Sequence, residues 1–244
     1  MELQLTGIDI ITADLVLVTG LRIGGGDNEM RIGGVDNQVI RHPLTLQPYI
    51  PGSSLKGKVR SLLEWRSGAV REEPLGFTHY ERSSGMQQTQ VKAILQLFGM
   101  SGDTELSKDL AQEFGPTRLS FWDCDLKQEW LNDISAENQI PLEVKSENSI
   151  RRISGTAENP RQTERVAAGS VFDFKLSIKR LNNDNENLLQ TVLQGLKLLE
   201  RDSLGGSGSR GYGKVRFDNL KINGKDISAE FDVMDPFDLK AVSN

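Results

Sequence analysis

The clearest potential for chemistry lies in an incomplete phosphate-binding loop, PYIPGSSLKGKVRSLLEW, which begins at Pro48. Gly52, Gly57 and Lys58 match the nucleotide-binding pattern G-x-x-x-x-G-K-[ST] up to its last position, which is Val59. Valine has no hydroxyl to bind magnesium, and the preceding segment HPLTLQPYIP has three prolines where a buried parallel strand would run. We therefore reject nucleotide hydrolysis.

The same stretch still suits a phosphodiester, because a helix start offers backbone N–H groups beside hydroxyl and cationic side chains. From Arg41 to Arg71 the chain has six basic residues against one acid, although its net charge is −5. A single basic run can be merely a solvated face. The candidate RNA-binding residues here are Ser53, Ser54, Lys56, Lys58 and Arg60.

A second glycine-rich motif, GSGSRG, matches the dinucleotide fingerprint G-x-G-x-x-G in letters only. It follows a predicted helix and precedes a predicted strand, the reverse of the order that a dinucleotide site needs. Five glycines between Gly205 and Gly213 instead predict positive φ angles and close approach to a ligand, unless the loop is simply flexible. The candidate RNA-binding residues here are Gly206, Ser207, Gly208, Ser209, Arg210 and Gly211.

A short repeat, RIGGGDN at 22–28 and RIGGVDN at 31–37, places Asp27 and Asp36 in glycine-rich sequence. Two copies without the spacing G-G-x-G-x-D exclude a calcium-binding solenoid. An ionised loop carboxylate can hold a hydrated metal ion or orient a hydroxyl, and it can also serve only to form a turn. Both readings stay open for these two residues.

Composition sets the limits for these sites. The chain has 244 residues, of which 37% are hydrophobic and 26% charged, as in an ordinary soluble protein. It has no apolar run near the roughly 20 residues that span a bilayer, and its N-terminus does not resemble a signal peptide, so we expect a cytoplasmic protein without a membrane partner. Cys124 is the single cysteine, which excludes an intramolecular disulfide.

Hydrophobic periodicity predicts the elements that position the candidate residues. Strands are expected at 8–18, 118–126, 170–179 and 214–222, and helices from Ser53, at 88–98 and at 187–202. For the first helix, Ser53 or Ser54 is the expected N-cap. The order strand, helix, strand, strand, helix, strand predicts an α+β fold with a ferredoxin-like core, the topology of the RNA-recognition motif.

Three separated motifs carry a family resemblance: GGVDNQVIRHPLTLQPYIPGSSLKGKVRSLLE, ENSIRRISGTAENPRQTERVAAGSVFDF and LGGSGSRGYGKVRF. Together they resemble the RAMP superfamily, and specifically the repeated backbone subunit of type III-A (Csm) CRISPR effector complexes. The resemblance covers nearly the whole chain in the expected order. The related subunit of type III-D complexes is not separated from it by these motifs.

The resemblance implies a single domain over residues 1–244, with a modified RNA-recognition-motif core at about 1–66, 118–126 and 169–225. It implies a lid insertion at about 67–117 and a thumb hairpin at about 127–168. Copies of such a subunit would form a filament along a guide RNA, beside other subunits of the complex, and the thumb would wedge into the guide–target duplex. Arg22, Arg152, Arg161 and Arg165 complete the candidate RNA-binding set.

The resemblance also implies that each copy cleaves guide-paired target RNA with Mg²⁺ or another divalent cation. The cleaving aspartate matches Asp36, as metal ligand or as base, whereas Asp27 does not align with it. Two positions depart from the family pattern: His42 replaces an acid in IRDP, and Arg151 replaces the acid in IDR.

Two alternatives remain beside a target-cleaving subunit. A non-catalytic scaffold that binds guide RNA would keep every basic feature. A guide-processing endoribonuclease would need a base such as histidine near the glycine-rich motif, and neither His42 nor His79 is close to it in sequence. With aromatic residues at 6%, we expect contacts to the RNA backbone and not a base-stacking platform.

Overall fold

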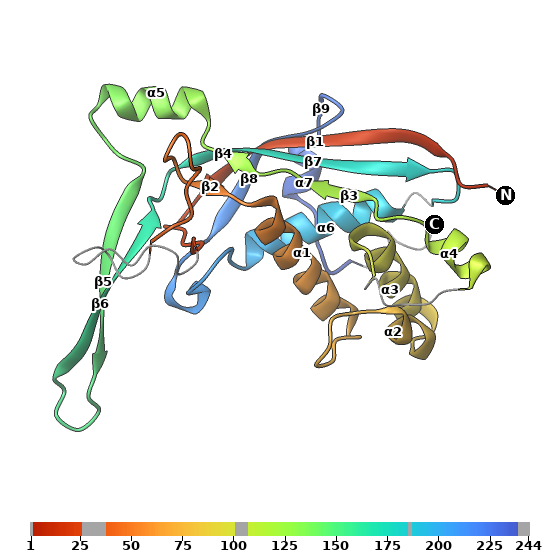
Figure 1. Ribbon diagram of the computed structural model, residues 1–244, viewed down its shortest axis with the longest axis horizontal. Coiled ribbons are helices and arrows are strands. Elements are labelled where there is room, and N and C mark those ends of the chain that lie inside the picture. Colours follow the sequence, from red (N-terminus) through yellow and green to blue (C-terminus); the bar gives the residue numbers. More distant parts are fainter. Residues whose placement is uncertain (1, 26–37, 101–106, 185–186, 239–244) are drawn as a thin grey trace.

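A five-stranded antiparallel sheet is the centre of the structure, a computed structural model that describes residues 2–25, 38–100, 107–184 and 187–238 (Figure 1). Its strands, in spatial order, are β3 (Leu119–Phe121), β7 (Val171–Leu181), β1 (Leu5–Leu17), β8 (Val215–Ile222) and β9 (Lys225–Asp226). The first four have the order of a ferredoxin-like sheet, which the sequence predicts. β9 extends the edge beside β8.

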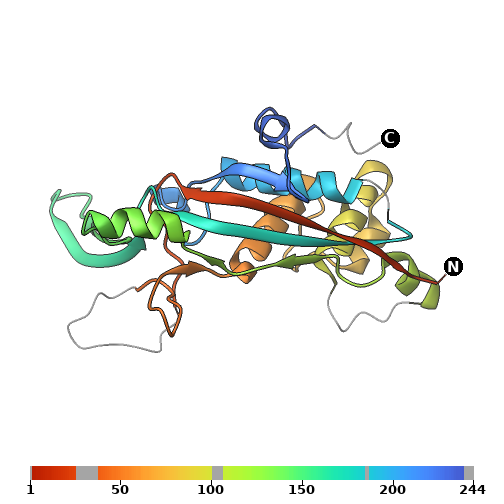
Figure 2. The ribbon, with the colours of Figure 1, turned by 90° about the horizontal axis from the view of Figure 1, so that it is seen from above.

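The sheet is covered by helices on one side (Figure 2). In β1, Ile11, Ala13, Leu15 and Leu17 are buried, and they alternate with residues that face the other side. The covering helices are α1 (Gly52–Ser67) and α6 (Asn187–Arg201). A Cβ at Gly195 in α6 would lie 2.7 Å from Val59 Cγ1, so this glycine allows the two helices to approach each other closely. Among the described residues, no helix could cross a membrane.

The start of α1 differs from the prediction. Pro51, and not Ser53 or Ser54, is the N-cap residue, and no side chain caps it. The Gly52 N–H donates instead to Asp123 Oδ1 at 2.7 Å. A side chain at Gly52 would place its Cβ 2.4 Å from the Phe121 carbonyl oxygen, so only glycine fits here.

This close approach also explains why the predicted strand 118–126 is not continuous. It is divided into β3 and β4 (Cys124–Asp125), and β4 leaves the main sheet to pair with β2 (Tyr49–Ile50). Trp122 and Asp123 lie between the two strands, where Asp123 meets the start of α1. Periodicity alone could not show that a helix start interrupts the strand.

In the described part of segment 67–117, three helices surround a small apolar cluster of their own. They are α2 (Phe77–Arg82), α3 (Gly85–Phe98) and α4 (Lys108–Phe114). α3 corresponds to the predicted helix 88–98, and it ends at Gly99, whose φ is 89°. The cluster consists of Leu75, Val91, Leu95 and Phe114.

A β-hairpin projects from the body of the molecule (Figure 1). The hairpin consists of β5 (Leu142–Ile150) and β6 (Ala157–Val166), and it follows α5 (Gln128–Ala136). At about 3.4 Å per residue, a nine-residue strand gives it a length of about 30 Å. Its root, defined by Leu142 and residues 164–166, joins the body. The resemblance implied a hairpin here, whereas hydrophobic periodicity did not.

Arg118 is a fully buried cation that joins three parts of the fold. Its Nη2 donates to Asp184 Oδ1 at 2.7 Å, in the turn that follows β7. Its Nη1 donates to the carbonyl of Phe114 at 2.8 Å, at the end of α4, and also to the carbonyl of Pro116. The charge is therefore neutralised by one carboxylate and shared with backbone oxygens.

Substituting Arg118→Ala is expected to lower the free energy of unfolding by about 3 to 5 kcal/mol, because the buried Asp184 carboxylate loses its cation. The control is Lys92→Ala, which removes a more exposed ion pair to Glu113 and should cost less than about 1 kcal/mol. Urea unfolding of the full chain measures both. Equal midpoints for the two variants would contradict this assignment.

Candidate nucleic-acid interface

The hairpin root is bonded to the segment that follows β1. Leu21 and Val166 exchange two backbone hydrogen bonds of 3.0 and 2.8 Å. Beside this pair, a Cβ at Gly20 would lie 2.5 Å from Arg165 Nε, so glycine makes room for the arginine. The hairpin therefore starts from a backbone junction and not from a flexible linker.

A buried carboxylate joins the root to the flank of the glycine-rich repeat. Glu164 accepts a hydrogen bond from the Val39 N–H at 3.0 Å and forms an ion pair with Arg41. Val39 also pairs with Gly24 in a β-bridge, and the Ile40 N–H donates to the Ile23 carbonyl at 2.8 Å. The two flanks of segment 26–37 thus meet at the hairpin root.

Asp27 and Asp36 themselves lie outside the described residues. Asp36 precedes Val39 by three positions in the sequence. Val39 is the residue whose N–H donates to Glu164, so this contact is close to Asp36 along the chain. Among the described residues, no group of three or more His, Cys, Asp or Glu side chains could hold a metal ion. The described donor set therefore does not form a metal site.

The glycine-rich loop, residues 205–213, packs against the same segment. The N–H groups of Gly206 and Gly213 donate to the carbonyls of Arg22 and Gly20, each at 2.9 Å. The predicted positive φ angles are confirmed, and they occur at Gly205, Ser207, Gly211 and Gly213. A Cβ at Gly213 would lie 1.9 Å from the Leu204 carbonyl oxygen, so the turn needs glycine at this position.

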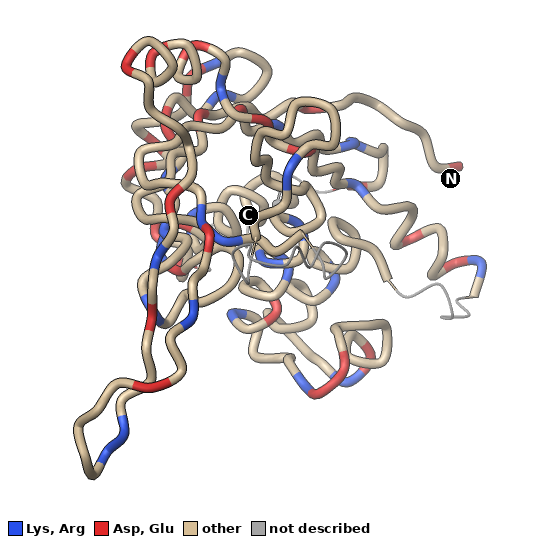
Figure 3. Tube along the Cα trace, turned by 60° about the vertical axis from the view of Figure 1, so that its left-hand side comes forward, with Lys and Arg blue, Asp and Glu red and all other residues tan. Residues whose placement is uncertain are grey.

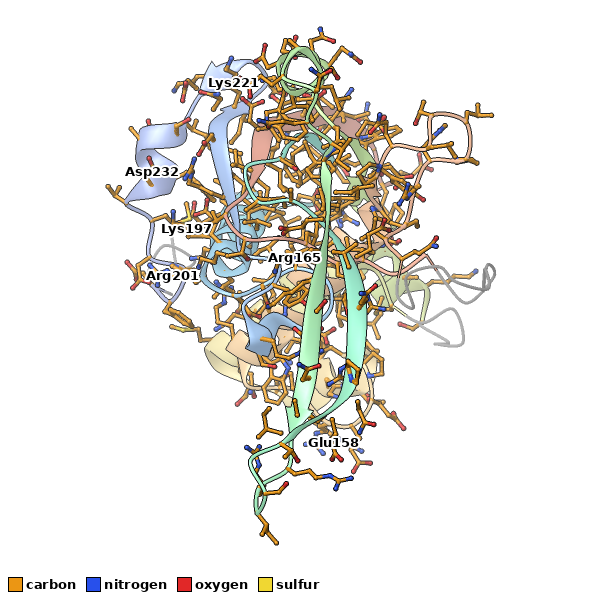
Figure 4. All side chains as sticks on the ribbon, turned by 90° about the vertical axis from the view of Figure 1, so that its left-hand side faces the viewer. Glu158, Arg165, Lys197, Arg201, Lys221 and Asp232 are labelled. Atoms are coloured by element: carbon orange, nitrogen blue, oxygen red, sulfur yellow. The ribbon has the colours of Figure 1, made fainter. Side chains whose placement is uncertain are left out.

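Tyr212 connects the glycine-rich loop to the hairpin. The residue is 1% exposed, and its hydroxyl donates to Glu147 Oε1 at 2.9 Å. Arg210 Nη1 lies 3.3 Å from the other oxygen of Glu147. Lys145 Nζ and Arg165 Cζ lie 4.5 and 4.9 Å from the centre of the tyrosine ring. Figure 4 shows Arg165 beside the body and Glu158 toward the far end of the hairpin.

These contacts decide the protonation states in the cluster. The hydrogen bond from Tyr212, with the charges of Arg210 and Lys145, holds the pKa of the Glu147 carboxyl below its ordinary value. Burial and the hydrogen bond to Glu147 raise the pKa of Tyr212. At neutral pH the contact is therefore a protonated phenol that donates to a carboxylate, which is a charge-assisted hydrogen bond.

The candidate residues on α1 have different surroundings. Ser53 is exposed, and Ser54 and Lys56 are partly exposed. Lys58 Nζ forms an ion pair of 2.7 Å with Asp202. The Gly52 N–H, which the sequence offered as a ligand for phosphate, is already bonded to Asp123, so that part of the expectation is corrected.

Arg60 is bonded on all sides by protein atoms. Its guanidinium donates to Glu64 in the same helix at 2.7 Å, to the Leu75 carbonyl at 2.8 Å and to the Gly99 carbonyl at 3.1 Å. The last two acceptors belong to the segment that contains α2 and α3. In this structure Arg60 thus fastens that segment to α1.

The arginines of the hairpin also fall into two groups. Arg151 forms an ion pair with Glu158, and Arg165 Nε donates to Glu143 at 2.6 Å. Arg152 and Arg161 are exposed and have no ion pair among the described residues. Figure 3 shows basic and acidic positions distributed along the hairpin. At its tip, Ile153 is fully exposed.

His42 and His79 each accept a backbone hydrogen bond at Nδ1. The donors are the N–H groups of Leu44 at 3.2 Å and of Gly76 at 3.1 Å, respectively. His42 thus shapes a turn where relatives were expected to have an acid. Among the described residues, neither histidine forms a hydrogen bond with the glycine-rich loop.

Glu147, Glu164 and Tyr212 are not among the residues that the sequence predicts for the site. Two of the three are acids within a charged hairpin, where nothing in the sequence separates buried carboxylates from solvated ones. Tyr212 did carry a signal, because it is the one aromatic residue inside the glycine-rich loop. An aromatic ring among glycines must pack against something outside the loop.

Comparisons with known proteins agree with this architecture. A model of the RAMP superfamily matches residues 14–216. The protein "CRISPR system Cms endoribonuclease Csm3" of Methanothermobacter thermautotrophicus is 40% identical over 233 residues, with 89% of this chain and 86% of the relative covered. The protein of the same name from Mycobacterium tuberculosis is 42% identical over 226 residues and covers 86% of each chain.

Solved structures give the same picture. A chain of the Csm3–Csm4 subcomplex of a type III-A CRISPR–Cas interference complex has a TM-score of 0.53 at 27% identity, over 90% of this chain and 80% of that one. A chain of the type III-B Cmr-beta complex has a TM-score of 0.57 at 16% identity, over 88% and 60%, and supports the fold alone. Since the superfamily match and these relatives span most of the sequence, the chain belongs to the RAMP superfamily and, within it, to the Csm3 family.

Proposed function

We propose that the protein is a guide-RNA-binding backbone subunit of a type III CRISPR interference complex, and that it also cleaves the bound target RNA at regular intervals. Its partners would be further copies of itself, other subunits of the complex, the guide and the target. Its relatives are named endoribonucleases. The observation that carries the proposal is the junction at the hairpin root, where the flank of the Asp36 segment, the glycine-rich loop and the hairpin are bonded together.

The guide would be held through its backbone. The glycine-rich loop offers closely approachable backbone groups with Arg210, and α1 offers Ser53, Ser54 and Lys56. Phosphate contacts carry no sequence information, which suits a guide of arbitrary sequence. Sequence would then be read by base pairing between guide and target.

The hairpin would act on the guide–target duplex from its tip. Ile153 is a fully exposed apolar side chain, and Arg152 beside it is an exposed cation. Apolar side chains that enter between base steps unstack and kink a duplex, while a neighbouring cation binds the phosphates. The tip would thus displace one target nucleotide from the helix at each subunit.

The proposed reaction is attack of a target 2′-hydroxyl on the adjacent phosphorus. The bond from O2′ to phosphorus forms and the bond from phosphorus to O5′ breaks, leaving a 2′,3′-cyclic phosphate and a 5′-hydroxyl. The proton of the 2′-hydroxyl goes to a base, for which Asp36 is the candidate, and O5′ gains a proton. Helical RNA lacks the in-line geometry, so displacement of the nucleotide would supply much of the acceleration. A divalent cation such as Mg²⁺, if held by Asp36, would stabilise the charge on the phosphate.

The variant Asp36→Asn is expected to reduce target cleavage by at least about 100-fold and to leave target binding unchanged, because a neutral amide neither accepts the proton nor binds the cation as a carboxylate does. The matched control is Asp27→Asn, in the first copy of the repeat, which should cleave as the wild type does. Both are measured as products of a guide-complementary RNA cut by the reconstituted complex.

Full cleavage by Asp36→Asn would overturn the catalytic assignment. Tight target binding without cleavage by the wild-type complex would instead identify the protein as the non-catalytic scaffold. Loss of cleavage in both aspartate variants would show that the glycine-rich repeat acts as a whole and that Asp36 has no special role.

Guide binding predicts a salt signature for Lys56, which has no ion pair among the described residues. Lys56→Ala should weaken binding of single-stranded guide RNA and reduce the slope of log K against log salt concentration by about 0.7 per subunit. Lys92→Ala, which removes a lysine already paired with Glu113, is the control and should leave the slope unchanged. An unchanged slope for Lys56→Ala would remove this lysine from the RNA interface.

A further inference from the structure

The hairpin is long, and it joins the body at its root. A strand of this length is about 30 Å long, so a tilt of about 10° at the root would move the tip by about 5 Å. This displacement exceeds the rise between successive base pairs along the helix axis, which is about 3.4 Å in B-form DNA and smaller in A-form RNA. Under the function proposed above, the angle of the hairpin would therefore decide which target nucleotide the tip meets.

The backbone junction at the root does not fix this angle alone. Leu21 pairs with Val166, the last residue of β6. Glu164, two residues away, adds the contacts with Val39 and Arg41. All of these contacts lie within three residues at the end of the hairpin, so together they can act as a hinge. A second contact farther along the hairpin is needed to hold the angle.

Tyr212 provides that second contact. Its partner Glu147 is five residues beyond Leu142, which pairs with Val166, so the hydroxyl reaches the hairpin about 17 Å from the hinge. The tyrosine belongs to the glycine-rich loop, which is bonded through Gly206 and Gly213 to the segment after β1. The contact thus forms a brace between the body and the middle of the hairpin.

The hydrogen bond between Tyr212 and Glu147 does not depend on whether RNA is bound, because Tyr212 is not itself a ligand for phosphate. Arg210 also meets Glu147, but it is exposed and is itself a candidate ligand for phosphate. Tyr212 is buried and uncharged, and its ring lies under Lys145 and Arg165. If Arg210 moves to a phosphate, the phenol can keep its hydrogen bond to the carboxylate.

We propose that Tyr212 is a positioning residue that holds the hairpin at a fixed angle to the guide-binding surface through Glu147, and thereby sets the nucleotide at which the target is cut. The cleavage part of this inference rests on the proposed function, whereas the fixed angle does not. The experiment therefore measures the angle and the cut site separately.

The angle is measured as a spin-label distance between the hairpin tip and the sheet in the full chain. Labels are placed at Ile153→Cys and Lys221→Cys, both exposed positions. The native Cys124 is buried, and burial raises the pKa of its thiol to about 12, so it should not react with the label. The wild-type background should give a narrow distance distribution.

Tyr212→Phe keeps the ring under its two cations and removes only the hydroxyl, so it should broaden the distance distribution and lower the melting temperature by only a few degrees. Tyr212→Ala removes the ring as well and should broaden it further. The matched control is Tyr80→Phe, in α2, whose ring packs against Phe114 away from the hairpin. An unchanged distribution in both Tyr212 variants would overturn the inference, whatever the cleavage result.

In the reconstituted complex, Tyr212→Phe should bind guide and target within about twofold of the wild type. Loss of one hydrogen bond to a charged group corresponds to about a tenfold effect, so cleavage at the normal position should fall about tenfold while cuts at neighbouring nucleotides increase. Glu147→Ala, which removes the acceptor of this hydrogen bond, should give the same pattern. Wild-type cut positions and rates in both variants would overturn the role in cleavage. A broadened distance distribution in a complex whose wild type does not cut would support the brace and refute only the proposed nuclease function.

Discussion

Close backbone contact, possible only where side chains are absent, is the constraint on which the rest of this structure depends. The segment after β1 receives hydrogen bonds from the glycine-rich loop at Gly20 and Arg22, and it pairs with the hairpin at Leu21. A Cβ at Gly205 would lie 2.3 Å from the Arg22 carbonyl oxygen. Glycines therefore bring together three segments that are far apart in the sequence. The glycine-rich loop is a structural joint as well as a candidate ligand surface.

Several residues of the basic clusters form ion pairs within the protein, so they are not free cations before RNA binds. Lys58, Arg165 and Arg210 are candidate RNA ligands, and each already has a carboxylate partner in the protein. These pairs are partly exposed, so each contributes little stability and can exchange one anion for another at small cost. An acidic protein can in this way carry cations that are neutralised until a polyanion arrives.

The sequence predicts the core well and the site only in part, for physical reasons. β1 and α1 bury one face, so their periods of two and 3.6 are visible in the residues themselves. The hairpin has no such face: most of its residues are exposed or half-buried, and charged residues occupy both strands. The N-cap of α1 was misplaced because its first N–H is bonded by Asp123, 71 positions away. Glu164 was missed because its burial depends on Val39 and Arg41, which approach it only in the folded chain.

The distribution of apolar contacts shows why such a hairpin needs fixed attachment. The sheet and its helices share one buried cluster, and segment 67–117 has its own smaller cluster. Val166, at the root, is the one buried hairpin residue that belongs to the large cluster. A two-stranded hairpin without an apolar face is marginally stable in water, so its order must come from the body at one end or from a partner at the other. The contacts of Glu147 and Arg165 with Tyr212, and of Glu164 with Val39, therefore do for the hairpin what apolar packing does for the core. They do so at the end where the candidate RNA-binding elements meet.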